Sequence, residues 1–155
     1  MAGQVLDLDS LLAPLAEGDG AGVDLRADWS PGSPYQTLRD ARSDARAEER
    51  ARDAEGETDA PPAEGWKVVR RVAEKAIRDS SKDFEVAAWL AESLVRTDGL
   101  AGLTDAAELL AGLLERYWDN GFPRPDEDGL EGRAAPLGGL SGAEADGTLM
   151  QPLRC

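Results

Sequence analysis

The sequence contains no histidine, and its one cysteine, Cys155, is the last residue. Without histidine the chain cannot form a Ser-His-Asp or Cys-His catalytic arrangement or a histidine-ligated metal site. It also lacks the side chain most often used for proton transfer near neutral pH. A lone cysteine cannot form an intrachain disulfide, which fits a reducing compartment.

Positive charge is also scarce. The chain has 17 lysines and arginines against 31 acidic residues, for a net charge of -14 over 155 residues. Such a chain should repel nucleic acid and anionic membranes, so basic protein faces are its expected electrostatic partners. No apolar run approaches the roughly 20 residues of a membrane-spanning helix. The acidic amino terminus lacks the basic start of a secretory signal, so we expect a cytoplasmic protein without direct membrane insertion.

The first third of the chain is interrupted by glycine and proline. Residues 9–16 can form one helical turn, and the glycines and prolines of residues 17–34 exclude a long regular element. Val23, Leu25 and Trp29 alternate with charged residues, which predicts an extended strap laid over a core. No second segment offers itself as a strand partner, so we expect no sheet.

Apolar periodicity predicts helices at residues 34–54, 65–79, 82–97 and 100–119, a flexible loop at 55–64 and a short helix at 143–150. Short connections favour an antiparallel packing, and the fold class is therefore a compact, all-α single domain over residues 1–155. The helix at 82–97 is apolar around most of its girth, which places Trp89 in the core. Ser80 and Asp83 have the spacing of a capping box at its start, and Asp98-Gly99 ends it.

The other helices have one apolar face each. For the helix at 65–79 the predicted apolar face is Trp66, Val69, Ala73 and Ala76 or Ile77, with Val68 and Val72 beside it. For the helix at 100–119 it is Leu100, Leu103, Ala107, Leu110, Leu114 and Tyr117, with Leu109, Leu113 and Trp118 alongside. The opposite side of the helix at 65–79 carries the one dense basic region of the chain: Lys67, Arg70, Arg71, Lys75 and Arg78. This side is either a solvated face that balances neighbouring acids or a docking face for an acidic partner.

Catalytic and cofactor signals are weak. Asp126, Glu127 and Asp128 form only a fragment of a calcium loop. The glycines at 18, 20 and 22 lack the strand and helix that a dinucleotide site needs. An acid-dependent hydrolase using Glu17 or Asp24 is conceivable, but nothing positions either residue against a nucleophile or an oxyanion site. We therefore expect no enzyme, no metal and no cofactor.

Several segments occur together in a familiar order: GVDLRAD at 22–28, Trp66-x-x-Val69, SKDFEVAAWLAESL at 81–94, GLAGL at 99–103 and LLERYWDNGFPRPDEDG at 113–129. Together they resemble the ImpA-related amino-terminal domain of the TssA family of the bacterial type VI secretion system, from about Leu11 to Leu153. The matching motif residues are Asp24, Leu25, Arg26, Trp66, Ser81, Asp83, Trp89, Tyr117, Trp118 and Pro123. Phe122-Pro123, Gly65 and Gly139-Leu140 depart from the family, which often has His-Pro, an acid and Trp-Leu there.

The resemblance implies a non-enzymatic assembly factor that docks baseplate, tube or sheath proteins of the secretion machine. Family members continue into carboxy-terminal regions that form rings, so this chain is expected to be a truncated form or a short member, and the full-length protein an oligomer. Lys67, Arg70, Arg71 and Lys75 are the candidate docking residues. For the motif at 24–26, Leu25 either fills the core while Arg26 pairs with a helix carboxylate, or the strap faces a partner. The alternative function is a free-standing helical regulator or chaperone-like module.

Overall fold

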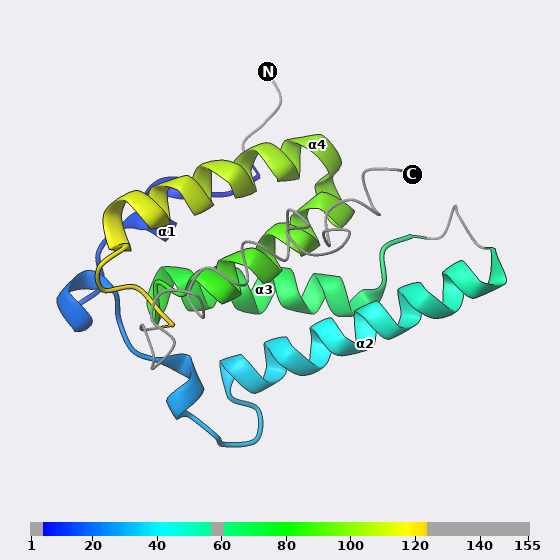
Figure 1. Ribbon diagram of the computed structural model, residues 1–155, viewed down its shortest axis with the longest axis horizontal. Coiled ribbons are helices and arrows are strands. Elements are labelled where there is room, and N and C mark those ends of the chain that lie inside the picture. The colour runs from blue at the N-terminus through cyan, green and yellow to red at the C-terminus, as the bar shows by residue number, and fades with distance from the viewer. Residues whose placement is uncertain (1–4, 57–60, 124–155) are drawn as a thin grey trace.

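A computed structural model describes residues 5–56 and 61–123 of the chain. Its helices are α1 (Leu8–Leu12), α2 (Pro34–Glu55), α3 (Glu64–Asp79) and α4 (Phe84–Tyr117), with single 3-10 turns at Gly18–Gly20 and Leu25–Ala27 (Figure 1). Over the described ranges there is no strand, only two isolated bridges, Gly22 to Ser81 and Asp83 to Phe122. The all-α prediction is thus confirmed. The expectations for residues 126–128, 139–140 and 143–150 fall outside the described residues.

Helices α2 and α4 begin at side-chain caps. The Ser33 hydroxyl accepts a hydrogen bond from the Gln36 amide at the start of α2. The Asp83 carboxylate accepts one from the Val86 amide at the start of α4. The predicted capping box was wrong in one respect: Ser80 follows the end of α3, where its amide bonds to the Ala76 carbonyl, and Asp83 itself is the cap. Two helix ends meet here, which the spacing alone did not separate.

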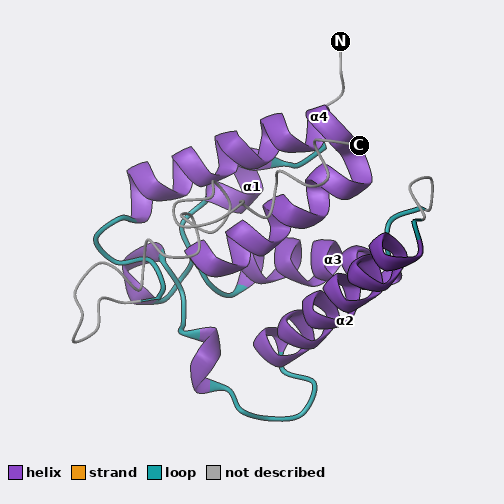
Figure 2. Ribbon diagram, turned by 45° about the vertical axis from the view of Figure 1, so that its right-hand side comes forward, coloured by secondary structure: helices purple, strands orange, loops and turns teal. Residues whose placement is uncertain are grey.

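Helix α4 consists of two helical halves that meet at Gly99, where the chain bends back on itself. This residue has φ 60° and ψ -135°, a conformation that glycine adopts without steric cost. The two halves of α4 therefore form a helical hairpin, visible in Figures 1 and 2, and they correspond to the two helices predicted at 82–97 and 100–119. A side chain at Gly102 would clash with the Leu94 carbonyl, so the halves are in close contact near the turn.

The helices alternate in direction, as the short connections predicted. Helix α3 packs against α2 on one side and α4 on the other, and α1 packs against α4 and α3 (Figure 1). At the start of α3, a side chain on Gly65 would clash with the Ala41 carbonyl and Ala45. The glycine at this position, one of the departures from the family pattern, thus permits close approach of α2 and α3.

The buried face of α3 is the predicted one: Trp66, Val69, Ala73, Ala76 and Ile77. Trp89 is also buried, as predicted. The second half of α4 differs from prediction in part. Leu109, Leu113 and Tyr117 are buried as expected, but so are Gly102, Asp105 and Ala106, whereas Leu100 is 72% exposed. The cause is Asp105, whose carboxylate accepts hydrogen bonds from the amides of Val5 (2.6 Å) and Leu6 (2.9 Å). Because a charged residue belongs to the buried face, the apolar pattern alone predicted part of that face incorrectly.

The strap is not extended, which corrects another prediction. The Asp24 carboxylate accepts a hydrogen bond from the Arg26 amide and turns the chain into the 3-10 helix Leu25–Ala27. Leu25 is buried, but Val23 is 44% exposed and Trp29 is 76% exposed. The apolar residues of the strap therefore do not share one face. None of the described helices is long and apolar enough to cross a membrane.

Candidate protein-docking site

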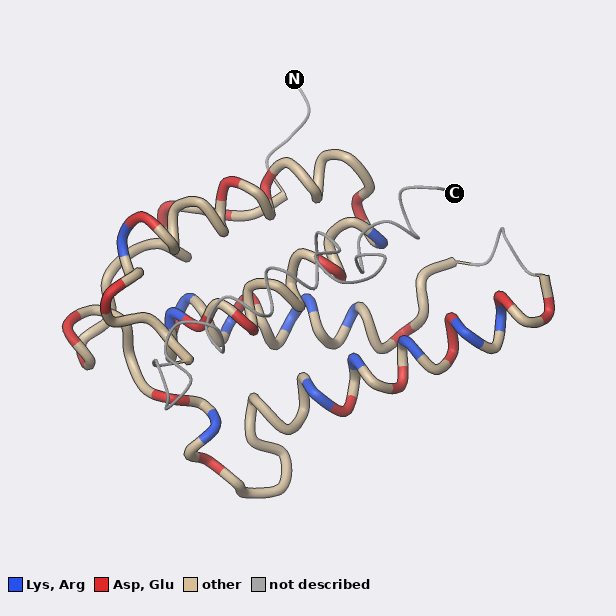
Figure 3. Tube along the Cα trace, in the orientation of Figure 1, with Lys and Arg blue, Asp and Glu red and all other residues tan. Residues whose placement is uncertain are grey.

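The basic residues predicted to dock a partner belong to α3, along which Lys and Arg positions recur (Figure 3), and none of them is among its buried residues. Three of the five basic residues there have carboxylate partners. Lys67 pairs with Glu64 at 3.1 Å, Arg70 with Asp98 at 2.5 Å, and Arg78 with its neighbour Asp79 at 3.4 Å. These cations are already balanced in part within the fold, so they are weaker candidates than the sequence suggested.

Arg71 and Lys75 are different. Both are exposed, they are one helical turn apart, and neither forms an ion pair with any of the described residues. They line a surface hollow of about 420 Å³ between α3 and the start of α2, and a second of about 520 Å³ between α3 and Thr97 of α4. The first hollow, called the basic groove from here on, is lined by Gly32, Pro34, Thr37, Arg71, Val72, Lys75, Ala76 and Ser80.

The basic groove combines two kinds of chemistry. The guanidinium of Arg71 can bind a carboxylate through two parallel hydrogen bonds, and the ammonium of Lys75 supplies a compact second charge. The half-buried Val72 adds apolar surface between them. This arrangement suits an acidic polypeptide that also contributes apolar contact.

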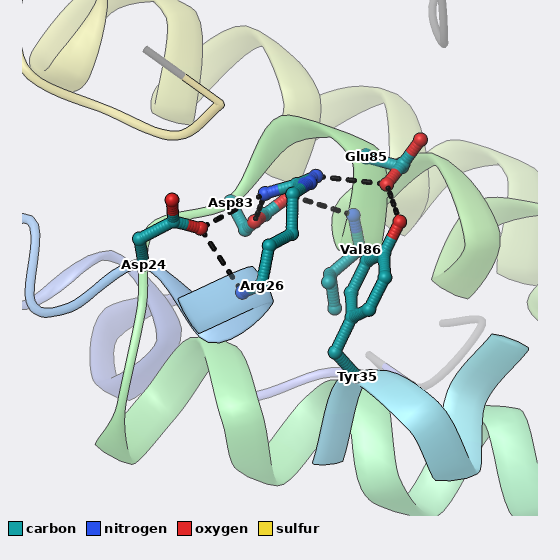
Figure 4. A network of polar contacts seen from close by, with 6 residues as sticks. All are labelled: Asp24, Arg26, Tyr35, Asp83, Glu85 and Val86. Atoms are coloured by element: carbon teal, nitrogen blue, oxygen red, sulfur yellow. Dashed lines mark hydrogen bonds and ion pairs between the residues drawn. The ribbon is translucent and has the colours of Figure 1, made fainter. Parts of the chain in front are cut away.

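Within the motif at 24–26, Arg26 attaches the strap to the start of α4, and Asp24 accepts a hydrogen bond from the Arg26 amide (Figure 4). The Arg26 guanidinium donates to both carboxylate oxygens of Asp83, at 2.7 and 3.2 Å, and to Glu85 at 2.8 Å. The Tyr35 hydroxyl donates to the same Glu85 oxygen at 2.8 Å. The guanidinium also lies 4.9 Å from the centre of the Tyr35 ring. One arginine thus connects the strap, α2 and α4.

Burial controls the ionisation of this network. Asp83 is fully buried, and burial raises the pKa of its carboxyl against the opposing effect of Arg26. Burial, together with the hydrogen bond to Glu85, raises the pKa of Tyr35 to about 12. The contacts match the structural interpretation of the motif, in which Leu25 fills the core and Arg26 pairs with a helix carboxylate.

A second network joins α2 to the first half of α4, and sequence analysis missed it. Arg42 forms a bidentate ion pair with the buried Glu92: its Nε and Nη2 donate to the two carboxylate oxygens at 2.7 and 3.0 Å. Glu49 accepts hydrogen bonds from Arg96, at 2.5 and 3.2 Å, and from the Trp66 indole at 2.8 Å. The one sequence signal for this network was a spacing of seven residues between positions 35, 42 and 49 of α2. Their side chains form hydrogen bonds with those at positions 85, 92 and 96 of α4. Charged residues at such positions are ordinarily assigned to the surface.

The SKD motif lies in the interior. The Lys82 amine is fully buried and donates to the carbonyls of Leu11 (2.6 Å) and Ile77 (2.8 Å). Burial lowers the pKa of Lys82 to about 8. The Ser81 hydroxyl is buried and has no hydrogen-bond partner in the described structure. Lys82 therefore joins α1 to the end of α3, a structural use of lysine that the motif did not reveal.

The remaining motif residues are structural or peripheral. Trp66 and Tyr117 are buried, and the Tyr117 hydroxyl donates to the Leu12 carbonyl at 2.7 Å. Trp118 is 36% exposed and stacks on Phe84. Pro123 follows a cis peptide bond at the end of the described region. Among the residues that the structure describes, no three acidic or cysteine side chains gather in a way that could hold a metal ion.

Comparisons with known proteins agree with this architecture. The family described as "ImpA, N-terminal, type VI secretion system" matches residues 12–142. Type VI secretion system component TssA1 of Pseudomonas aeruginosa is 31% identical over 150 residues, covering 92% of this chain and 39% of that protein. A solved structure of the N-terminal domain, including the conserved ImpA_N region, of the TssA component from Burkholderia cenocepacia superposes with a TM-score of 0.63 at 29% identity.

The structural match covers 88% of this chain and 48% of the solved chain. The chain thus spans about two fifths of the curated relative and about half of the solved one. The family match covers well over half of the chain. The chain therefore belongs to the family of ImpA amino-terminal domains and is a TssA-related component of the type VI secretion system.

Proposed function

We propose that this domain is a non-enzymatic, cytoplasmic adaptor that docks baseplate, tube or sheath proteins while the secretion machine assembles, and that the basic groove on α3 is its docking surface. The proposal rests mainly on the exposure of Arg71 and Lys75 and on their lack of an ion-pair partner among the described residues. In a chain of net charge -14, these two exposed cations have no ion-pair partner among the described residues and line the same hollow. The family membership supplies the setting.

Of the four docking residues proposed from sequence, ion pairs within the domain favour two over the other two. Lys67 and Arg70 have carboxylate partners on the domain itself, at 3.1 and 2.5 Å. A partner would have to compete with those carboxylates, whereas Arg71 and Lys75 are available to it. We therefore assign the main electrostatic contact to Arg71 and Lys75, with Lys67 and Arg70 at the edge of the surface. Interactions at such an edge act mainly on the association rate and on its salt dependence.

The test is an affinity capture from a bacterium that contains the machine and expresses this protein with a tag, with the captured proteins identified by mass spectrometry. The test variant is Arg71→Glu combined with Lys75→Glu. The matched control is Arg39→Glu combined with Arg50→Glu, because these α2 arginines are exposed and have no ion pair among the described residues. Both variants change the net charge equally.

The proposal requires that the unaltered protein and the control capture baseplate, tube or sheath proteins, and that the α3 variant captures much less of them. Equal capture by both variants would exclude the basic groove. Capture of none of these proteins from cells shown to contain the machine would contradict the adaptor function and favour a free-standing helical regulator.

A further inference from the structure

We infer that Trp29 is the aromatic anchor of the basic groove, and that the groove takes an acidic peptide segment carrying a bulky apolar side chain. This inference rests on the proposed function, because it names the chemistry of the partner at the same surface. It assigns a role to an exposed tryptophan that neither the core nor the polar networks use.

Trp29 is unusual in its exposure. It is 76% exposed, whereas Trp66 and Trp89 are buried and Trp118 stacks on Phe84. Tryptophan is strongly enriched among the few residues that contribute most of the binding energy at protein interfaces. A side chain of this size in water forgoes a large apolar transfer free energy, which a partner that covers it would recover.

The segment that presents Trp29 is already ordered by its own hydrogen bonds. The Asp28 carboxylate accepts from the Ser30 amide at 3.0 Å and from the Ser30 hydroxyl at 2.5 Å. The Ser33 amide donates to the Ser30 carbonyl at 3.1 Å, and Ser33 is the buried cap of α2. On the other side, Arg26 is fixed by its ion pairs to α4. Binding through a pre-ordered segment costs less conformational entropy.

The same segment forms one wall of the basic groove. Gly32 and Pro34 line the hollow opposite Arg71 and Lys75. Trp29 precedes Gly32 by three residues, so its backbone lies within roughly 11 Å of the wall even if the chain were fully extended. At the other end, the Val23 amide donates to the carbonyl of Ser80, a groove residue, at 2.9 Å. Val23 is 44% exposed. Two segments that adjoin the basic groove thus each carry an exposed apolar side chain.

Charge decides which occupant suits this surface. Arg71 and Lys75 require negative groups, whereas Val72, Val23 and Trp29 favour apolar contact. A nucleic acid carries dense charge over a long surface, and a chain of net charge -14 would repel it. A second copy of the chain would bring the same repulsion. An acidic peptide with an aromatic or large aliphatic residue satisfies both requirements with a short contact.

Two short synthetic polymers separate these requirements: poly-L-glutamate and the random copolymer of glutamate and tyrosine in a 4:1 ratio. Both are used at a length of a few residues, because a long polyanion would be repelled by a chain of net charge -14. Binding to the 155-residue chain is measured by calorimetry at low ionic strength and by tryptophan fluorescence. The variants are Trp29→Ala and the Arg71→Glu, Lys75→Glu pair. The controls are Leu100→Ala, which removes another highly exposed apolar side chain, and the Arg39→Glu, Arg50→Glu pair.

The copolymer is expected to bind at least tenfold more tightly than poly-L-glutamate, and Trp29→Ala to remove most of that difference. The α3 charge variant should weaken both polymers, and neither control should weaken either. The Trp29 emission, isolated by comparison with Trp29→Ala, should shift to the blue only with the copolymer. Equal affinity for the two polymers, or full retention of copolymer binding by Trp29→Ala, would overturn the inference. So would association of the chain with itself through Trp29 without polymer binding.

The affinity capture distinguishes failure of this inference from failure of the proposed function. If the α3 charge variant loses secretion-system proteins but Trp29→Ala keeps them, the docking surface stands and the aromatic anchor does not. If neither variant changes the capture, the groove itself is excluded. If both lose the same proteins while Leu100→Ala keeps them, anchor and groove act on one partner.

Discussion

Replacing Arg42 by methionine is expected to destabilise the fold more than replacing its partner Glu92 by leucine. The reason is an asymmetry in exposure: the Glu92 side chain is 1% exposed, whereas that of Arg42 is 24% exposed. Without Arg42, the Glu92 carboxylate remains buried without a charged partner. Without Glu92, the guanidinium of Arg42 can turn toward water and keep its contact with the Trp89 ring, now 5.7 Å away.

Removing one partner of a buried ion pair costs about 3–5 kcal/mol. Because Arg42 is partly solvated, we expect about 3 kcal/mol for Arg42→Met, which corresponds to a fall in melting temperature of roughly 6–12 °C for a chain of this size. For Glu92→Leu we expect about 1 kcal/mol, the typical net value of a lost hydrogen bond. The double variant should lie near the unaltered protein, because replacing both charges with apolar groups leaves neither stranded.

The measurement is equilibrium unfolding in urea, followed by circular dichroism at neutral pH. Arg52→Met serves as the control, since it removes the surface pair between Glu48 and Arg52 on the same helix and a hydrogen bond to the Pro61 carbonyl; it should cost no more than about 1 kcal/mol. The reasoning is refuted if Arg42→Met costs less than Glu92→Leu, or if the double variant is as unstable as the two single losses added together.

Three further predictions concern other parts of the fold. The contribution of Lys82 to the free energy of unfolding should rise by about 2 kcal/mol between pH 8 and 10. The pKa of Lys82 is about 8 when buried and 10.5 ordinarily, so the unfolded chain binds more protons at this residue in the interval. Urea titrations should show the rise as the difference between the unaltered protein and Lys82→Met, since Tyr35, with its raised pKa, titrates in both. Leu25→Ala should cost about 2–5 kcal/mol, since Leu25 is buried, and should leave copolymer binding unchanged at a temperature where the variant stays folded; lost binding with unchanged stability would instead support a partner-facing strap. Gly99→Ala should lower the free energy of unfolding by about 1–3 kcal/mol. The cost comes from backbone strain alone, because an added side chain meets no atom there. Gly56→Ala is the comparison: Gly56 is exposed and also has positive φ, so it tests whether the cost is specific to the hairpin.

The family membership was determined by sequence, because it rests on the order of short segments, which needs no coordinates. The apolar period of α3 was equally readable, since Trp66, Val69, Ala73 and Ile77 occupy one side of a helix whatever surrounds it. Two helix boundaries also followed locally: Pro34 marks the start of α2, and Gly99 marks the bend within α4. Such signals act within a few residues along the chain, so they can be read from the sequence without the tertiary structure.

The polar interior was decided only by tertiary structure. Nothing near Glu92, Asp105 or Lys82 in the sequence shows that a distant arginine, two amino-terminal amides or two helix-end carbonyls will compensate its burial. The same holds for the docking surface. The sequence made Arg70 and Arg71 equivalent neighbours, but folding brings Asp98 to Arg70 and turns Arg71 toward an open hollow beside the segment that carries Trp29. Which ion pairs and hydrogen bonds form depends on which chain segments meet in space, and a local stretch of sequence does not contain that information.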